Sequence, residues 1–165
     1  MYEGSSALVL RDALSTSAQL HLIDPFVDQS GWSLRPDWRA SPVATKLALA
    51  RRPRGTGPNV CWHIARSQDV GRDWRGPAVD LVFIDGDHHP DACLEDWDVW
   101  HSHVRPGGWI AFHDARDSRP GGSGSPGPTC VVDRLFRASG PPEDWSIAEE
   151  CDTMVVVQRA AAAVG

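Results

Sequence analysis

The 165-residue sequence contains no apolar run long enough to span a bilayer, and its start lacks the basic and apolar segments of a signal peptide. It has no Cys-x-x-Cys pair: its four cysteines are widely spaced, which favours buried free thiols over disulfides or a zinc site. With a net charge of -6 and scattered arginines, it has no basic patch for a nucleic acid. We therefore expect a cytoplasmic protein of one domain that binds neither membranes nor nucleic acids.

Two apolar runs that end in polar residues organise the chain. The run Val79–Ile84 predicts a strand buried on both faces of a parallel sheet, and residues 109–112 predict a second, shorter strand. A helix with Pro90 in its first turn separates them, so the strands should pair in parallel and end at one edge of the sheet, where open α/β sheets bind ligands. The polar residues that follow the two runs are Asp85, Asp87, His88, His113 and Asp114.

The segment between these strands predicts an amphipathic helix that ends at residues 105–108, with the sequence RPGG. Its expected inward positions are Ala92, Cys93, Val99, Trp100 and Val104. We expect Trp97, Trp100 and Trp109 to pack between helix and sheet rather than to form a platform for a ligand.

The start of the chain is typical of the second half of a nucleotide-binding strand-loop-helix unit. Gly4 precedes two serines and a predicted helix over residues 7–14, and we expect a serine to cap that helix. Asp24 ends the predicted strand Gln19–Ile23 about 20 residues after Gly4, the spacing at which an acid binds ribose hydroxyls. The alternative role of Asp24 is that of a turn residue before Pro25.

The other segments are predicted from periodicity and from breaker residues. We expect loops at residues 25–42 and at residues 116–128, the second being a candidate lid. Helices are expected at residues 43–52, at residues 66–74 and at residues 129–136, the last capped by Thr129. Strands are expected at residues 59–64, 145–149 and 153–158, with the last two forming an antiparallel hairpin at the sheet edge and a frayed tail over residues 160–165.

Three motifs at this spacing carry a resemblance to a known family: residues 83–88 (FIDGDH), 105–108 (RPGG) and 111–114 (AFHD). The chain resembles the class I S-adenosylmethionine-dependent methyltransferases. Within them it is similar to the family 24 type, which contains macrocin-type sugar O-methyltransferases and proteins labelled cephalosporin hydroxylase. The resemblance implies an α/β, Rossmann-like methyltransferase fold over residues 1–159, with a mostly parallel sheet and an antiparallel C-terminal strand.

The resemblance also implies roles for individual residues. Asp85, His113 and Asp114 match positions that bind a divalent metal, Mg²⁺ or Mn²⁺, although His113 could instead only orient Asp114. Asp87 or His88 matches the base that removes a proton from an acceptor hydroxyl. Asp85-Gly86-Asp87 could also be only a strand-ending turn. The residues that match the S-adenosylmethionine site are Glu3, Gly4, Ser5, Ser6, Asp24, Ser67, Gln68 and Asp85.

One departure from the family concerns the first strand, which would precede Met1. The chain could be truncated, could pair the strand at Gln19 with the strand at Val79, or could take a strand from a partner, and a homo-oligomer is therefore possible. The implied function is O-methylation of a hydroxylated small molecule, such as a sugar or a natural-product glycoside. The alternative is a non-catalytic remnant that acts as a binding protein.

Two other enzyme classes fit less well. A nicotinamide-dependent oxidoreductase would need Gly-x-Gly-x-x-Gly, of which only Gly4 is present. A non-haem iron oxygenase could use His113 with Asp114, but its usual His-x-Asp spacing and its jelly-roll strands are absent from the sequence pattern.

Overall fold

The computed structural model describes residues 4–26, 45–46, 49, 57–116, 126–138 and 140–162. The chain divides into two compact units, Met1–Val70 and Gly71–Gly165. Each unit is described by itself below. Most of the loop expected at residues 25–42, most of the helix expected at residues 43–52 and most of the candidate lid lie outside the described residues.

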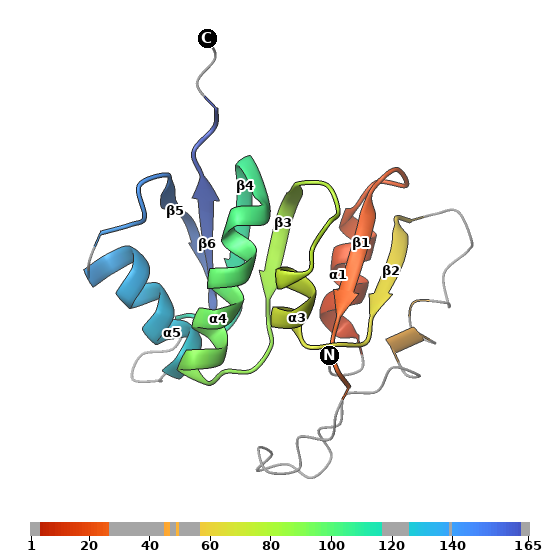
Figure 1. Ribbon diagram of the computed structural model, residues 1–165, viewed down its shortest axis with the longest axis horizontal. Coiled ribbons are helices and arrows are strands. Elements are labelled where there is room, and N and C mark those ends of the chain that lie inside the picture. Colours follow the sequence, from red (N-terminus) through yellow and green to blue (C-terminus); the bar gives the residue numbers. More distant parts are fainter. Residues whose placement is uncertain are drawn as a thin grey trace. The chain divides into compact units, whose positions relative to one another are not determined.

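The first unit is a parallel strand pair with a helix (Figure 1). Helix α1 (Ser5–Ala13) leads to strand β1 (Gln19–Ile23), which pairs in parallel with β2 (Asn59–His63) from Gln19↔Asn59 to Ile23↔His63. The short helix α3 (Ser67–Arg72) begins in this unit. Its apolar cluster contains the buried residues Ala7, Leu20 and Leu22 and the partly buried residues Leu10, Leu14, Leu49, Val60 and Trp62.

The expected serine cap on the first helix is wrong. Gly4 is the N-cap residue of α1, at φ 78°, and no side chain caps the helix. A Cβ atom on Gly4 would lie 2.6 Å from Thr45 Cγ2, so glycine is required here both by the left-handed backbone and by the close approach of Thr45.

The second unit has a four-stranded sheet in the order β3-β4-β6-β5 (Figure 1). Strand β3 (Val79–Ile84) is followed by helix α4 (Pro90–Trp100), the 3₁₀ turn η1 (His101–His103) and β4 (Val104–Phe112), which pairs with β3 in parallel, as predicted. Helix α5 (Pro126–Val132) continues into the π-helix η2 (Asp133–Ala138). Strands β5 (Trp145–Cys151) and β6 (Met154–Arg159) form the predicted antiparallel hairpin, with β5 at the edge of the sheet.

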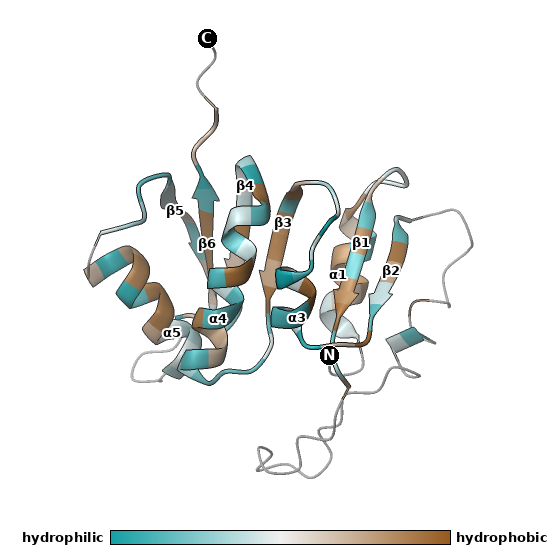
Figure 2. Cartoon of the chain, viewed as in Figure 1, coloured by the Kyte–Doolittle hydropathy of each residue, from teal (hydrophilic) through white to brown (hydrophobic). Residues whose placement is uncertain are grey.

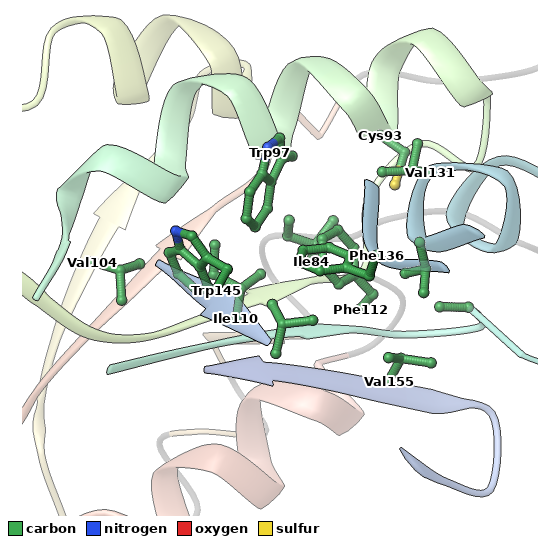
Figure 3. Close-up of a cluster of buried hydrophobic side chains, with 13 residues drawn as sticks. Ile84, Cys93, Trp97, Val104, Ile110, Phe112, Val131, Phe136, Trp145 and Val155 are labelled. Carbon is green, nitrogen blue, oxygen red and sulfur yellow. The ribbon is translucent and has the colours of Figure 1, made fainter. Parts of the chain in front are cut away.

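Helices α4 and α5 cover one face of this sheet. The core between the helices and the sheet is rich in aromatic residues. Brown and teal residues alternate along the continuous helix formed by α5 and η2 in Figure 2, because Val131, Val132 and Phe136 are buried while Asp133, Arg134 and Arg137 are exposed. The Trp97 indole points from α4 into the core (Figure 3) and packs edge-on against Phe136 and Trp145, with ring centroids 5.2 and 5.0 Å away. Phe112, at the end of β4, is fully buried in the same cluster. The core therefore holds the end of β4 firmly, next to His113.

The prediction that residues 105–108 end a helix is wrong, because these residues belong to β4. The helix ends at Trp100, and Val104 is buried on the strand instead. Gly107 has φ 76°, and the register of β3 and β4 shifts between Val79 and Leu81. A bulge accommodates the glycines as extra residues of β4, which explains why residues typical of a helix stop occur within a strand.

Other boundaries also differ from the prediction. Helix α5 begins at Pro126, so Thr129 is inside the helix and does not cap it, and the end of the candidate lid is helical. Helix α3 ends at Arg72 rather than at Trp74. Proline is readily accommodated in the first turn of a helix, because the missing N–H there has no helical partner.

Several burial predictions are wrong. Strand β3 is buried only at Ile84, and Leu81 is 41% exposed. Trp97 and Trp100 are buried, but Trp109, beside Leu81 in the register, is 37% exposed. All four cysteines are free thiols, yet Cys130 and Cys151 are exposed. No helix among the described residues is long and apolar enough to cross a membrane.

Candidate active site

Acidic and histidine side chains meet where β3 and β4 end. His113 Nδ1 lies 3.3 Å from Asp85 Oδ1 and 3.3 Å from Asp114 Oδ2. His88, which follows β3, places Nε2 3.9 Å from Asp114 Oδ2. We call Asp85, His88, His113 and Asp114 the carboxylate–histidine cluster. Their side chains are 27% to 37% exposed, so none of them is sealed from solvent.

Two backbone features bring this cluster together. The His113 N–H donates to the Ile84 carbonyl at 3.0 Å, which extends the pairing of β3 and β4 beyond the last residues of the strands. Asp114 has φ 54°, in the left-handed region that Asp adopts more readily than most residues. The chain therefore turns directly after His113, and the Asp114 carboxylate faces the imidazoles of His113 and His88.

The Nδ1 atom of His113 is buried and makes no hydrogen bond, although two carboxylate oxygens lie 3.3 Å away. The distances suit an electrostatic contact, but the direction does not suit an N–H donor. Most buried polar atoms have a hydrogen-bond partner, and leaving one without a partner costs stability. A ligand that bridges His113 and the carboxylates would remove this cost.

The donor atoms of the cluster are of the types that bind a divalent metal, and two of their separations have the scale of ligands on one ion. Two donors about 2.1 Å from one ion lie about 3.0 Å apart at a right angle and about 3.4 Å apart at a tetrahedral angle. The two separations of 3.3 Å have this scale. Within the described residues, however, no three His, Cys, Asp or Glu side chains are arranged to hold a metal ion. Holding one would require Asp85, His113 and Asp114 to move together.

The two residues predicted as alternatives for the base have different surroundings. Asp87 Oδ1 accepts a hydrogen bond from the His89 N–H at 2.9 Å, so this carboxylate closes the turn before α4, whose N-cap residue is His89. His88 instead faces Asp114. The geometry favours His88 as the base, and the assignment stays a prediction.

Sequence reasoning missed a contact between α5 and the loop that carries His88. A Cβ atom on Gly127 would lie 2.0 Å from the His88 carbonyl oxygen, so the two backbones touch and only glycine fits. Gly127 is buried. Its sequence signal is weak, because it lies in a stretch rich in Gly, Ser and Pro that is typical of a loop.

Cys93 is excluded as a nucleophile. The thiol is buried on α4, and burial raises its pKa to about 12, with further contributions from the carboxylates of Asp96 and Asp87. The thiolate form is the reactive one, so at neutral pH Cys93 is an inert core residue.

The predicted cofactor residues at the start of the chain lie at the beginning of α1. Gly4 is its N-cap residue, and Ser5 and Ser6 are its first two residues. Helix starts present N–H groups that suit an anion. Glu3 lies outside the described residues.

The remaining cofactor residues predicted in the first unit also follow strands. Asp24 follows β1, and its Oδ1 accepts a hydrogen bond from the Phe26 N–H at 2.7 Å, so the turn role named as an alternative is present. Ser67 and Gln68 begin α3, and Gln68 is only 8% exposed. Their binding roles stay predictions.

Comparison with solved structures identifies the class of fold. The chain superposes on SMU.1697c of Streptococcus mutans, in complex with SAH, with a TM-score of 0.56 at 11% identity over 96% of this chain and 84% of that one. It superposes on the O-methyltransferase TomG of Streptomyces achromogenes, in complex with SAM, with a TM-score of 0.52 at 17% identity over 88% and 74% of the two chains. The fold is therefore the Rossmann-like fold of methyltransferases, as predicted.

The family follows from the sequence. A family model described as a methyltransferase domain matches residues 1–115, which is more than half of the chain. The chain belongs to this methyltransferase-domain family. The match includes β3, β4 and all four residues of the carboxylate–histidine cluster.

Other matches span only part of their relatives. The chain covers 62% of a Corynebacterium glutamicum protein of known structure, with 87% of this chain aligned at 18% identity and a TM-score of 0.55. A mimivirus protein, R132 of Acanthamoeba polyphaga mimivirus, is 39% identical over 41 residues, which are 25% of this chain and 19% of that protein.

Proposed function

We propose that this chain is an S-adenosylmethionine-dependent O-methyltransferase that acts on a hydroxylated small molecule, such as a sugar or a natural-product glycoside. The observation that carries the proposal is the carboxylate–histidine cluster at the ends of β3 and β4. It supports the proposal because the family fold binds its ligands at this edge of the sheet. Binding of SAM by the structurally similar TomG is consistent with the choice of methyl donor.

Methyl transfer to a hydroxyl is a displacement in which the oxygen attacks the methyl carbon, the bond from that carbon to sulfur breaks, and the hydroxyl proton leaves. The protein can help by aligning the oxygen and by removing the proton. His88 has the position for the second task. With Nε2–H directed at Asp114, its Nδ1 would accept the proton, and the carboxylate 3.9 Å away would stabilise the imidazolium that forms.

Most of the residues that we propose for binding the methyl donor belong to the first unit. The N–H groups at the start of α1, after Gly4, suit the carboxylate of the donor, with Ser5 or Ser6 beside them. Asp24 would bind the ribose in addition to closing its turn. In this proposal Ser67 and Gln68 flank the adenine, and Asp85 serves both the cofactor and the metal.

We also propose that Asp85, His113 and Asp114 hold a divalent metal, Mg²⁺ or Mn²⁺. Such an ion would align the hydroxyl group and lower its pKa. The orphaned His113 Nδ1 atom supports this part, and the mixed oxygen and nitrogen donors favour Mn²⁺ over Mg²⁺, which prefers oxygen alone.

A turnover assay tests the proposal. Purified chain, radiolabelled S-adenosylmethionine, Mn²⁺ and a panel of sugars and glycosides should give labelled methyl ethers. His88→Gln should lower kcat by about 10²- to 10⁴-fold with little change in donor affinity, as expected for the loss of a base. Asp91→Asn is the matched control, because Asp91 is exposed in the first turn of α4 and lies outside the cluster.

Two results would contradict the proposal. Full activity of His88→Gln would remove His88 as the base. Binding of the donor without transfer to any acceptor, in wild-type chain that is folded, would favour the alternative that the chain is a non-catalytic binding protein. Activity that persists in excess chelator would remove the metal but leave the methyltransferase proposal intact.

A further inference from the structure

A pair of histidines in the first unit has no role in the site described above, although the Asp24 N–H donates to the His63 carbonyl at 3.1 Å. His21 on β1 and His63 on β2 bring their rings together, with His21 Nδ1 2.9 Å from His63 Nε2 and ring centroids 5.2 Å apart. His21 is the register partner of Cys61, two residues before His63, so the two imidazoles lie on the same face of the strand pair. Both rings are half-buried and remain accessible to an ion from solvent.

The distance between these nitrogens is that of two ligands on one metal ion. With metal–imidazole bonds about 2.0 to 2.1 Å long, two nitrogens lie about 2.9 Å apart at the right angle of a tetragonal ion such as Ni²⁺, and about 3.3 Å apart at the tetrahedral angle of Zn²⁺. The nitrogens of His21 and His63 already have the right-angle separation, as a hydrogen bond, and would move slightly apart around a tetrahedral Zn²⁺. An ion between them would replace that bond, and the donor ring would take its other tautomer.

Gln19 makes one tautomer of His21 suitable for this role. Gln19 Oε1 lies 3.4 Å from His21 Nε2, where it can accept a hydrogen bond from an Nε2–H. A ring that carries its proton on Nε2 presents the lone pair of Nδ1 to His63. Metal-binding histidines commonly donate their other N–H to a carbonyl or carboxylate in this way.

We propose that His21 and His63 form a two-histidine site for a late divalent transition metal, such as Zn²⁺ or Ni²⁺, on the β1–β2 face. Imidazole suits these ions, whereas Mg²⁺ and Ca²⁺ need oxygen ligands. No third His, Cys, Asp or Glu completes a metal group among the described residues, so water fills the remaining positions. The site shares no residue with the proposed methyltransferase site, but it adjoins Asp24, whose N–H donates to the His63 carbonyl.

Zinc binding should be measured in an Asp85→Asn, Asp114→Asn background, which removes the carboxylates of the other candidate site. Equilibrium dialysis at pH 7.5, with metal analysis of the retained protein, should show one bound Zn²⁺. His21→Gln and His63→Gln should each abolish it, and Gln19→Leu should weaken it by about tenfold or more. His103→Gln is the matched control, since this half-buried ring bonds instead to the Gly71 carbonyl.

The proposal is overturned if the background protein binds no Zn²⁺, or if His21→Gln, His63→Gln and His103→Gln retain equal amounts. A second measurement uses only the wild-type chain, so it does not depend on whether a variant folds. Zn²⁺, but not Mg²⁺, should slow the modification of His21 and His63 by diethyl pyrocarbonate in wild-type chain, read by mass spectrometry, and should leave His103 unaffected. Equal modification with and without Zn²⁺ would contradict the proposal.

Discussion

The two histidine clusters of this chain differ in what the imidazoles face. His113 and His88 face carboxylates, from Asp85 and Asp114, whereas His21 faces a second imidazole, His63. A carboxylate stabilises a cation beside it, whether a proton on a ring or a metal, while a second imidazole disfavours a proton on the first. Accordingly, burial and the neighbouring His63 lower the pKa of His21. We therefore propose proton transfer for the histidines at the ends of β3 and β4, and ligation in the neutral form for those on β1 and β2.

The largest expected effect comes from removing the charge that distinguishes the two clusters. Asp114→Asn keeps the shape but leaves His88 and His113 without the carboxylate that contacts both. We expect kcat to fall by about 10²- to 10⁴-fold, as for the loss of proton transfer. The measurement is steady-state turnover. Asp80→Asn is the control, because Asp80 pairs with Arg105 on the exposed surface, and equal losses in both variants would show that the effect is not specific to the cluster.

A smaller effect should follow from displacing His88 without changing it. Gly127→Ala would place a Cβ atom 2.0 Å from the His88 carbonyl oxygen, so α5 or the loop must shift. Overpacking of this kind costs about 1–3 kcal/mol, and kcat should fall while donor affinity is retained. Denaturant unfolding measures the loss of stability, and steady-state turnover measures the fall in kcat. In the control Gly57→Ala the new atom meets Arg11 Cγ at an ordinary 3.4 Å.

If Gly127→Ala were as stable and as active as Gly57→Ala, the contact between α5 and the His88 loop would have no role in holding the cluster. A loss of stability with unchanged kcat would assign Gly127 to packing alone.

The smallest expected effect concerns pH and the His21–His63 pair. Because the pKa of His21 is lower in the folded state than its usual value of 6.5, the unfolded chain binds the proton more readily. The stability from this group is therefore present above pH 6.5 and is lost as the pH falls through the folded-state pKa. Urea unfolding at several pH values should show a steeper acid loss in wild type than in His21→Gln. Identical slopes would contradict a neutral His21.

The convergence of Asp85, His113 and Asp114 could be predicted from sequence because it depends on a general rule of connection. A strand, a helix and a strand in this order give parallel pairing, and the polar ends then meet at one edge. The observed pairing of β3 with β4 follows that rule. The convergence of these residues is therefore a finding, while their roles in binding and catalysis stay predictions.

Other features depend on contacts that a local pattern does not reveal. The glycines at 107 and 108 are typical of a helix stop, but a bulge places them in β4. The need for glycine at position 127 is explained only by the close approach of the His88 backbone, which is far away in sequence. The His21–His63 pair needs the register of β1 with β2, since single histidines on two strands carry no signal until the strands are aligned. The single domain, the oligomeric state and the cytoplasmic location stay predictions.

The measurement that tests the central claim most directly is a calorimetric titration of the wild-type chain with S-adenosylhomocysteine, with and without Mn²⁺. We predict saturable binding in the micromolar range, worth about 8 kcal/mol, with a stronger signal when Mn²⁺ is present. A folded sample that gives no heat under either condition would contradict the claim that this chain binds the product of a methyl donor, and with it the proposed methyltransferase activity.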